Sequence, residues 1–366
     1  MSPLFQPWRL RGATFRNRIG VSPMCQYCAG EDGRPTDWHL AHLLSRAVGG
    51  AGMVMTEAAA VTPEGRISPH DLGIWDDSQL EGHRRLAASI AAVGAVPATQ
   101  LAHSGRKGSR APAWDTAPAT PGWEALAPSA EAFQGYDTPR AMTEADIEAA
   151  LAATVAAGVR AARAGYALVE LHAAHGYLLH QFLSPLSNRR NDAWGGGFDG
   201  RTRIVREAMG RLRAALPEEV ALGIRLSHTD WVEGGWTTEE TVELCRRLRG
   251  VADVADITSG GLDARQQIPV GPGYQLPGAA AVRAGAGLPV MGVGLITEPR
   301  QAEAALEAGQ CDMVLLARAL LREPHWPLRA AQELGAQDAF AIPPQYERGW
   351  GRFPLRRETG APLPAL

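Results

Sequence analysis

The feature that most restricts the fold of this chain is an alternation of short apolar runs with longer segments of helical character. Runs buried on both faces that alternate with helices indicate parallel strands joined by right-handed crossovers. Eight such units predict an α/β fold, a single-domain (β/α)8 TIM barrel. The runs cover residues 18–21, 52–56, 96–101, 167–171, 221–226, 254–258, 288–293 and 312–316.

Two features between the runs refine this prediction. In the segment "TEADIEAALAATVAAGVRAARAG", Thr143 is expected to cap a long helix, Asp146 to complete a capping box, and Gly165 to end it. The segment from Ser104 to Arg140 is rich in Pro, Ala and Trp and is too long for an ordinary connection. We therefore expect an excursion after the third strand that crosses the barrel mouth.

The composition favours an enzyme that acts on small molecules. The 366 residues are 45% hydrophobic and carry a formal net charge of -3, unlike a disordered chain or a nucleic-acid-binding protein. The first residues contain no apolar signal segment, and no stretch of about eighteen apolar residues is present. We therefore expect a soluble, cytoplasmic protein with no membrane or nucleic-acid partner. Four cysteines are too few for a disulfide framework.

Glycines and an arginine follow the seventh and eighth runs, where barrels of this type commonly bind phosphate. Gly292 and Gly294 would let backbone N–H groups approach an anion, and Arg318 offers a guanidinium suited to phosphate oxygens. The chain has no P-loop and no glycine motif typical of dinucleotide binding. We expect a phosphate at the barrel mouth and no Rossmann-type site.

Cys25 and Cys28 form a C-x-x-C motif, which is typical of thiol redox sites and of half a zinc site. His172 and His175 follow the fourth run and would meet this motif at the same mouth. Such a set of four ligands would suit a zinc-dependent barrel lyase or hydrolase, and this alternative stays open. Against it, the motif arises easily by chance and the thioredoxin context is missing.

The same histidines, together with Tyr177, also suit a clamp for a substrate oxygen. Two imidazole N–H groups would stabilise the negative charge that builds on a carbonyl or nitro oxygen when a hydride adds to the conjugated carbon. Tyr177, with an ordinary pKa of about 10, would keep its proton at neutral pH and donate it to the neighbouring carbon. The clamp is the better interpretation of the pair.

Six segments of the chain are "SPMCQYCA", "EAAAVTPEGRIS", "QLAHSGRK", "ELHAAHGYLLHQFLSPLSNRRND", "GIRLS" and "QYERGW". Together they resemble the Old Yellow Enzyme family of flavin-dependent ene-reductases, and its bacterial, thermophilic-like branch in particular. The resemblance covers residues 4–350. It implies an NADPH dehydrogenase or ene-reductase with FMN as cofactor and NADPH as hydride donor. Its substrates would be activated alkenes, namely α,β-unsaturated ketones and aldehydes, maleimides and nitroalkenes, reduced by a ping-pong mechanism.

The resemblance also implies a role for each matching residue, with no metal site among them. His172 and His175 would bind the substrate oxygen, Tyr177 would donate the proton, and Tyr27 would line the substrate pocket. Cys25 would approach the flavin and tune its reactivity. FMN would be held by Ser22, Pro23, Met24, Cys25, Ala59, Gln100, Arg225, Gly294 and Arg318, with the last two at its phosphate.

The last matching segment, "QYERGW", implies an assembly of subunits. In this branch, the arginine that matches Arg348 enters the active site of a neighbouring subunit, so we expect a homodimer or homotetramer with Arg348 in that position. Residues 1–350 would form the FMN-binding barrel and residues 351–366 a C-terminal extension. Cys28 departs from the family pattern, and it would permit a disulfide with Cys25 under oxidation.

Overall fold

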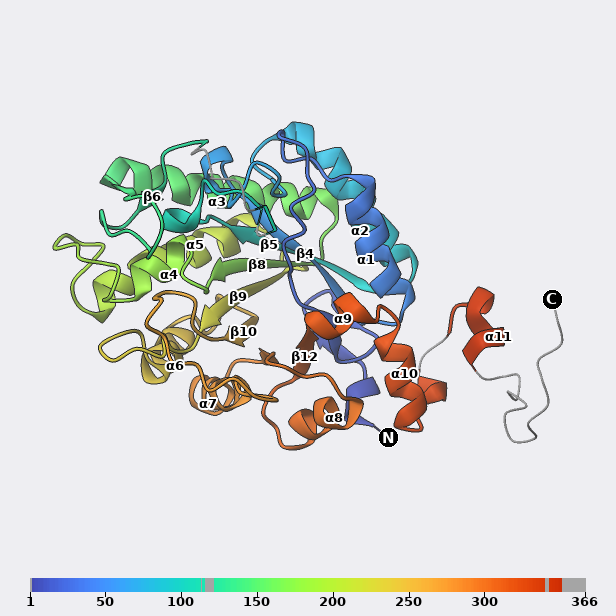
Figure 1. Ribbon diagram of the computed structural model, residues 1–366. Coiled ribbons are helices and arrows are strands. Elements are labelled where there is room, and N and C mark those ends of the chain that lie inside the picture. The colour runs from blue at the N-terminus through green and yellow to red at the C-terminus, as the bar shows by residue number, and fades with distance from the viewer. Residues whose placement is uncertain (1, 113, 116–121, 340–341, 351–366) are drawn as a thin grey trace.

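The structure is a computed structural model that describes residues 2–112, 114–115, 122–339 and 342–350. Its centre is a closed parallel barrel in which β3, β4, β5, β8, β9, β10, β11 and β12 follow one another and β12 pairs with β3 (Figure 1). Each strand overlaps one predicted run, so the predicted (β/α)8 barrel is confirmed. The strands are Ile19–Val21, Met53–Ala60, Val96–Ala102, Leu168–Ala173, Ala221–Ser227, Val254–Thr258, Val290–Gly292 and Met313–Leu316.

Helices surround the barrel, and the longest one begins and ends where the sequence predicts. The Thr143 hydroxyl accepts the N–H of Asp146 at 3.2 Å, and Gly165 ends α3 in the left-handed conformation with φ 96°. The helices are α1 (Asp37–Val48), α2 (Leu80–Ala92), α3 (Glu144–Ala164), α4 (Leu178–Leu183), α5 (Phe198–Ala215), α6 (Thr238–Arg247), α7 (Leu276–Ala286), α8 (Pro299–Glu307), α9 (Arg318–Arg322) and α10 (Trp326–Glu333). None of the described helices is long and apolar enough to cross a membrane.

A hairpin packs against the amino-terminal ends of the barrel strands. Strands β1 (Trp8–Leu10) and β2 (Ala13–Phe15) pair antiparallel. Phe15 is fully buried in one apolar cluster with residues near the starts of the barrel strands, such as Met53 and Leu168. This end is therefore filled with apolar side chains, and polar chemistry is left to the opposite end.

One barrel strand carries an irregularity that changes which side chains face inward. Strand β4 pairs with β5 through Met55 and Ala98, and then resumes at Ala58 opposite Gln100. Two residues of β4, Thr56 and Glu57, thus stand opposite a single residue of β5, which is the mark of a β-bulge. Side chains after the bulge lie on the face opposite to that expected from simple alternation.

The predicted excursion follows β5 and reaches the mouth of the barrel. It includes the short helix η4 (Gly105–Lys107) and the two-residue strands β6 (Leu126–Ala127) and β7 (Arg140–Ala141). The Arg106 guanidinium donates to the Leu262 carbonyl oxygen at 2.8 Å. Lys107 Nζ donates to the carbonyl oxygens of His175 and Gly261, each at 3.0 Å. The excursion therefore fastens the loops that follow β8 and β10 to each other.

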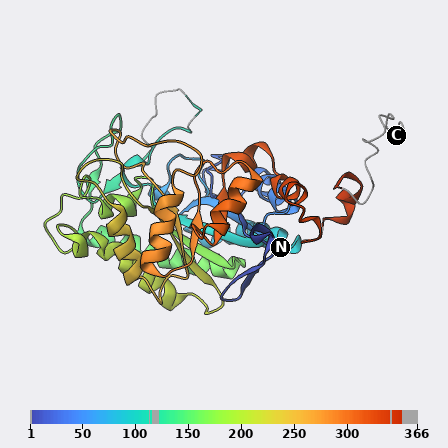
Figure 2. The same ribbon diagram turned by 90° about the horizontal axis from the view of Figure 1, so that it is seen from below.

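The C-terminal part of the chain leaves the barrel. Helix α11 (Glu347–Trp350) stands apart from it in both views (Figures 1 and 2). Arg348 on this helix is exposed. The extension expected for residues 351–366 lies outside the described residues.

Candidate active site

A cavity of about 510 Å³ opens at the carboxyl ends of the barrel strands. This is the end at which barrels of this kind carry their chemistry. Nine of the residues singled out from the sequence line it, drawn from four different strands and the segments that follow them: Ser22, Pro23, Cys25, Tyr27, Gln100, His172, His175, Tyr177 and Arg225.

His172 and His175 lie side by side because the chain turns sharply after β8. His172 is on the strand itself, whereas His175 takes the left-handed conformation with φ 57°. The ring centres are 5.3 Å apart, and Tyr177 lies 5.2 Å from His172. The turn thus brings three side chains close in sequence into one cluster.

Hydrogen bonds decide which ring nitrogens can donate. His172 Nδ1 accepts the backbone N–H of Ala174 at 3.3 Å, which places its proton on Nε2. His175 Nε2 lies 2.9 Å from Thr258 Oγ1, and this oxygen accepts a bond from the Gln275 amide at 2.6 Å. When the Thr258 hydroxyl donates to His175 Nε2, the neutral His175 ring carries its proton on Nδ1. In that arrangement, each ring keeps one N–H for a substrate oxygen.

Burial sets the charge of the cluster. It lowers the pKa of both His172 and His175 well below the usual range, and the nearby Arg225 lowers them further. Burial likewise raises the pKa of Tyr177 well above its ordinary value. The cavity therefore presents two neutral imidazoles and a phenol that keeps its proton.

The cysteine and lysine near this cluster are also tuned by burial. The pKa of Cys25 is raised well above that of a free thiol by burial and then by the negative charge of Asp71, so the side chain is a thiol. Burial lowers the pKa of Lys107 to about 8, and its ammonium lies 5.2 Å from the centre of the Tyr177 ring.

A layer of paired polar side chains forms the floor of the cavity. Gln100 donates through its side-chain amide to Glu170 at 2.7 Å, and Arg225 Nε lies 3.1 Å from Asp256. Each pair joins residues directly opposite on adjacent strands. Because Gln100 uses its amide hydrogens on Glu170, its amide oxygen stays available as an acceptor, while Arg225 supplies positive charge.

A second cavity of about 120 Å³ continues from the first, since both are lined by Gln275, Val293 and Ala317. It holds Gly294 and Arg318, the pair predicted for phosphate. Gly294 has φ 131°, and a Cβ there would approach Gln275 within about 3.0 Å, so the backbone is open only because this residue is glycine. The two cavities together form one site, with Arg225 in the larger part and Arg318 in the smaller part.

Two predicted residues, Met24 and Ala59, do not line either cavity. Ala59 is fully buried in the apolar core, and its neighbour Ala58 lines the larger cavity instead. The bulge in β4 accounts for this, because it shifts the alternation of side chains just before Ala58. Arg348 lies on α11, which stands apart from this chain's own cavity.

Residues at the end of β10 and in the loop that follows it contribute a wall that the sequence reasoning missed. Thr258, Ser259, Gln266, Tyr274 and Gln275 all line the cavity. The signal was present in "TSGG", a polar pair and two glycines at the carboxyl end of the sixth predicted strand. Gly176 and Gly261 are needed where this loop meets the turn after β8, because a Cβ on Gly261 would lie 2.7 Å from the His175 backbone.

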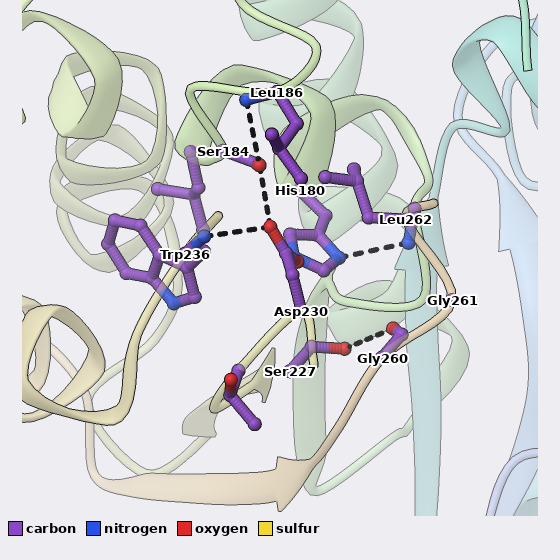
Figure 3. Close-up of polar contacts among 12 residues, drawn as sticks. His180, Ser184, Leu186, Ser227, Asp230, Trp236, Gly260, Gly261 and Leu262 are labelled. Carbon is purple, nitrogen blue, oxygen red and sulfur yellow. Dashed lines mark hydrogen bonds and ion pairs between the residues drawn. The ribbon is translucent and has the colours of Figure 1, made fainter. Parts of the chain in front are cut away.

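The turn after β8 is held from behind by a buried network (Figure 3). His180 Nδ1 accepts the N–H of Gly176 at 2.9 Å, so Nε2 carries the proton and faces Asp230 Oδ1 at 2.8 Å. Asp230 Oδ2 accepts bonds from the Ser184 hydroxyl at 2.6 Å and the Trp236 N–H at 2.8 Å. His180 and Asp230 are fully buried, so the network fixes the turn that carries His175 and Tyr177.

The structure does not support the zinc alternative. Among the described residues, the His, Cys, Asp and Glu side chains that approach closely enough to share a metal are Cys28, His39 and Glu57. Cys25, His172 and His175 do not belong to this group. Cys28 instead lies against His39, 3.7 Å from its Nε2.

Comparison with known proteins identifies the family. Residues 3–337 match the model of the NADH:flavin oxidoreductase / NADH oxidase family. The chain is 44% identical over 351 residues to an NADPH dehydrogenase of Geobacillus thermodenitrificans (strain NG80-2), covering 95% of this chain and 98% of the relative. It is 40% identical over 354 residues to an NADPH dehydrogenase of Listeria monocytogenes (serovar 1/2a, strain EGD-e), covering 96% and 100%.

Solved structures of similar proteins have the same fold. Morphinone reductase in complex with tetrahydroNAD superimposes with a TM-score of 0.75 at 25% identity, covering 97% of this chain and 98% of the other. The old yellow enzyme homologue from Zymomonas mobilis gives a TM-score of 0.76 at 24% identity, covering 96% and 99%, and supports the fold alone.

The residues of the two cavities suit FMN. The larger cavity offers hydrogen-bond groups on Gln100 and Arg225 for a flat polar ring, and the smaller one offers Arg318 and open backbone at Gly294 for a phosphate. The observed site and the similarity agree with the resemblance noted in the sequence. The chain belongs to the NADH:flavin oxidoreductase / NADH oxidase family, as an FMN- and NADPH-dependent oxidoreductase of the Old Yellow Enzyme type.

Proposed function

We propose that this protein is an ene-reductase that reduces the C=C bond of activated alkenes: α,β-unsaturated ketones and aldehydes, maleimides and nitroalkenes. The observation that carries the proposal is the cluster of two neutral histidines and a protonated tyrosine in one cavity. FMN held in this cavity would supply the hydride-transfer chemistry that links NADPH to the alkene in a ping-pong cycle.

His172 and His175 bind the substrate oxygen in this proposal. The N–H groups on His172 Nε2 and His175 Nδ1 are not used by protein partners and donate to a carbonyl or nitro oxygen. Because both rings are already oriented by Ala174 and Thr258, little reorganisation is needed as negative charge builds on that oxygen. This draws electrons away from the β-carbon and makes it the acceptor of the hydride.

Tyr177 delivers the proton to the α-carbon. Its phenol stays protonated at neutral pH because burial disfavours the phenolate. The nearby Lys107 ammonium, 5.2 Å from the ring, stabilises negative charge as the proton leaves. Tyr27, which lines the same cavity, shapes the substrate pocket.

The cofactor contacts we propose are those named from the sequence. Gln100 and Arg225 serve the ring of FMN, Arg318 and the backbone at Gly294 serve its phosphate, and Cys25 tunes it as a thiol. Ser22, Pro23, Met24 and Ala59 complete the proposed set, although Met24 and Ala59 line neither cavity. The FMN-binding domain spans residues 1–350.

We further propose a homodimer or homotetramer in which Arg348 reaches the active site of the neighbouring subunit. Support comes from α11, which stands apart from the barrel and exposes Arg348. A side chain placed so far from its own cavity is free to serve another one.

The experiment that tests the function is an anaerobic titration of the FMN-loaded protein with NADPH, followed by visible absorption. We expect the flavin colour to bleach with NADPH and to return when cyclohexenone is added. A protein that bleaches but does not recover with cyclohexenone, a maleimide or a nitroalkene would contradict the ene-reductase proposal. The saturated product, identified by mass, completes the assignment.

A further inference from the structure

A second cluster of ligating side chains lies beside the active-site cavity and takes no part in the proposed reaction. Cys28 follows the cavity-lining Tyr27, His39 is in the first turn of α1, and Glu57 is in the bulge of β4. Cys28 Sγ lies 3.7 Å from His39 Nε2, and His39 Nε2 lies 3.0 Å from Glu57 Oε1. One ligand atom from each residue lies within 4.8 Å of the other two.

Two of the three distances are close to those between ligands that share one tetrahedral metal ion. With Zn–S of about 2.3 Å and Zn–N or Zn–O of about 2.0 Å, tetrahedral ligands lie roughly 3.3–3.6 Å apart. The observed sulfur–nitrogen and nitrogen–oxygen separations, 3.7 and 3.0 Å, bracket this range. Small shifts of the side chains would bring all three to bonding distance.

One of the ligand atoms is a buried carboxylate oxygen. Glu57 Oε1 lies 3.0 Å from His39 Nε2, and the Glu57 side chain is 1% exposed. A carboxylate removed from water needs positive charge or a donor beside it, and a metal ion bound at His39 Nε2 would supply that charge.

The remaining polar atoms are arranged as supports for a metal site. Glu57 Oε2 accepts the backbone N–H of Gln26 at 2.9 Å, which fixes the carboxylate. His39 Nδ1 accepts the backbone N–H of Thr36 at 2.9 Å and lies 3.0 Å from Thr36 Oγ1, which holds the ring with Nε2 facing Glu57. Cys28 is partly exposed, which leaves a path for an ion to enter.

We propose that Cys28, His39 and Glu57 bind a thiophilic divalent cation, with Zn²⁺ as the ion best suited to this mixture of sulfur, nitrogen and oxygen. Binding forms a bond from the metal to the Cys28 sulfur and releases the thiol proton to the buffer. Water occupies the fourth position. The site lies outside the catalytic cavity, and its role is to fix the segment 25–28, from which Cys25 and Tyr27 line that cavity.

The test is a titration of the FMN-loaded protein with Cd²⁺ after removal of metals by chelation, following the ultraviolet charge-transfer band of a cadmium thiolate. Equilibrium dialysis with Zn²⁺, read by elemental analysis, gives the stoichiometry. We expect one ion per chain, competition between the two metals, and a rise in melting temperature with Zn²⁺. No binding by the wild-type protein would overturn the proposal.

The variants separate this site from the cysteine next to it. Cys28→Ser should weaken binding at least tenfold, whereas Cys25→Ser, which removes the other partly exposed thiol, should leave it unchanged. Glu57→Gln tests the carboxylate independently and should also weaken binding. Equal binding by Cys28→Ser, or loss of binding in Cys25→Ser, would show that other groups hold the metal. Neither readout requires alkene reduction, so failure here is distinct from failure of the proposed function.

Discussion

The chemistry of individual residues in this protein is governed by burial. Burial is the main reason that His172 and His175 are neutral, with a smaller contribution from Arg225, and it is also the main reason that Tyr177 stays protonated. Neutral donors suit a substrate oxygen that becomes negative only during the reaction, because they stabilise the transition state more than the ground state.

Replacing Tyr177 by Phe should separate the two halves of the catalytic cycle. The phenol is needed only when the alkene receives its proton, so oxidation of the reduced flavin by cyclohexenone should slow by about 10²-fold or more. Reduction by NADPH should keep its rate. Rapid mixing under anaerobic conditions measures each half separately, and equal slowing of both would argue for a general disturbance of the cavity.

His83 should make the protein sensitive to acid. Its ring is fully buried between the Tyr166 hydroxyl at 2.9 Å and the Gly73 carbonyl oxygen at 2.8 Å, and burial lowers its pKa from 6.5 to about 4. Below pH 6.5 the unfolded chain gains a proton that the folded chain does not. Stability contributed by this residue is therefore lost as the pH falls from 6.5 to 4, by up to about 3 kcal/mol.

The variant His83→Gln lacks this titration. The unfolding free energy of the variant, measured with urea, should fall less steeply between pH 6.5 and 4 than that of the wild type, with parallel curves above pH 7. Identical slopes in the acid range would contradict the assignment.

At the scale of elements, the turn between β8 and α4 depends on the buried network behind it. Asp230 supplies the carboxylate that faces His180 Nε2 at 2.8 Å in this network (Figure 3). Asp230→Asn keeps the shape and loses the charge, so it should lower the free energy of unfolding by about 2 kcal/mol.

Because this network holds His175 and Tyr177, the same variant should also slow alkene reduction. Ser184→Ala is the matched control, since it removes one neutral donor to the same carboxylate and should cost only about 1 kcal/mol. Both effects are measurable by denaturation and by the rate of flavin oxidation. If Asp230→Asn were as stable and as fast as the wild type, the turn after β8 would not depend on this network.

The sequence predicted the elements whose apolar and polar residues follow a regular pattern. The eight strands and the capped helix α3 follow from local patterns, and the site at Gly294 and Arg318 follows from where barrel strands end. The bulge in β4 has no such local signature, so Ala59 was chosen where Ala58 faces the cavity. The wall after β10 was missed because its residues are spread over a long loop and converge only in the folded chain.

At the scale of the whole molecule, the barrel is closed by apolar residues at one end and carries its polar residues at the other, while α11 stands apart. We expect the protein to elute and scatter light as a dimer or tetramer of its 39.0 kDa chain. A monomer at micromolar concentration would contradict a shared active site.

A mixing experiment tests the role of Arg348 more sharply. Arg348→Ala cannot supply the arginine to a neighbour, and His172→Ala cannot bind substrate, so each alone should be slow. After subunit exchange, a site with an intact cavity from the first variant and Arg348 from the second should regain activity. Arg300→Ala, which changes an exposed arginine of α8 that lines neither cavity, serves as the control. No recovery on mixing would mean that Arg348 acts within its own chain or not at all.

The contact between Gly176 and Gly261 has a consequence for how the substrate range of this protein can change. The two backbones touch with no room for a side chain on either, and Lys107 ties the same two loops together. Insertions or replacements in the loop after β10 will therefore displace His175, because this residue directly precedes Gly176. Libraries that vary this loop should alter substrate selectivity and turnover together. Variation around Tyr27 leaves the histidine pair in place, so it should change selectivity without changing turnover.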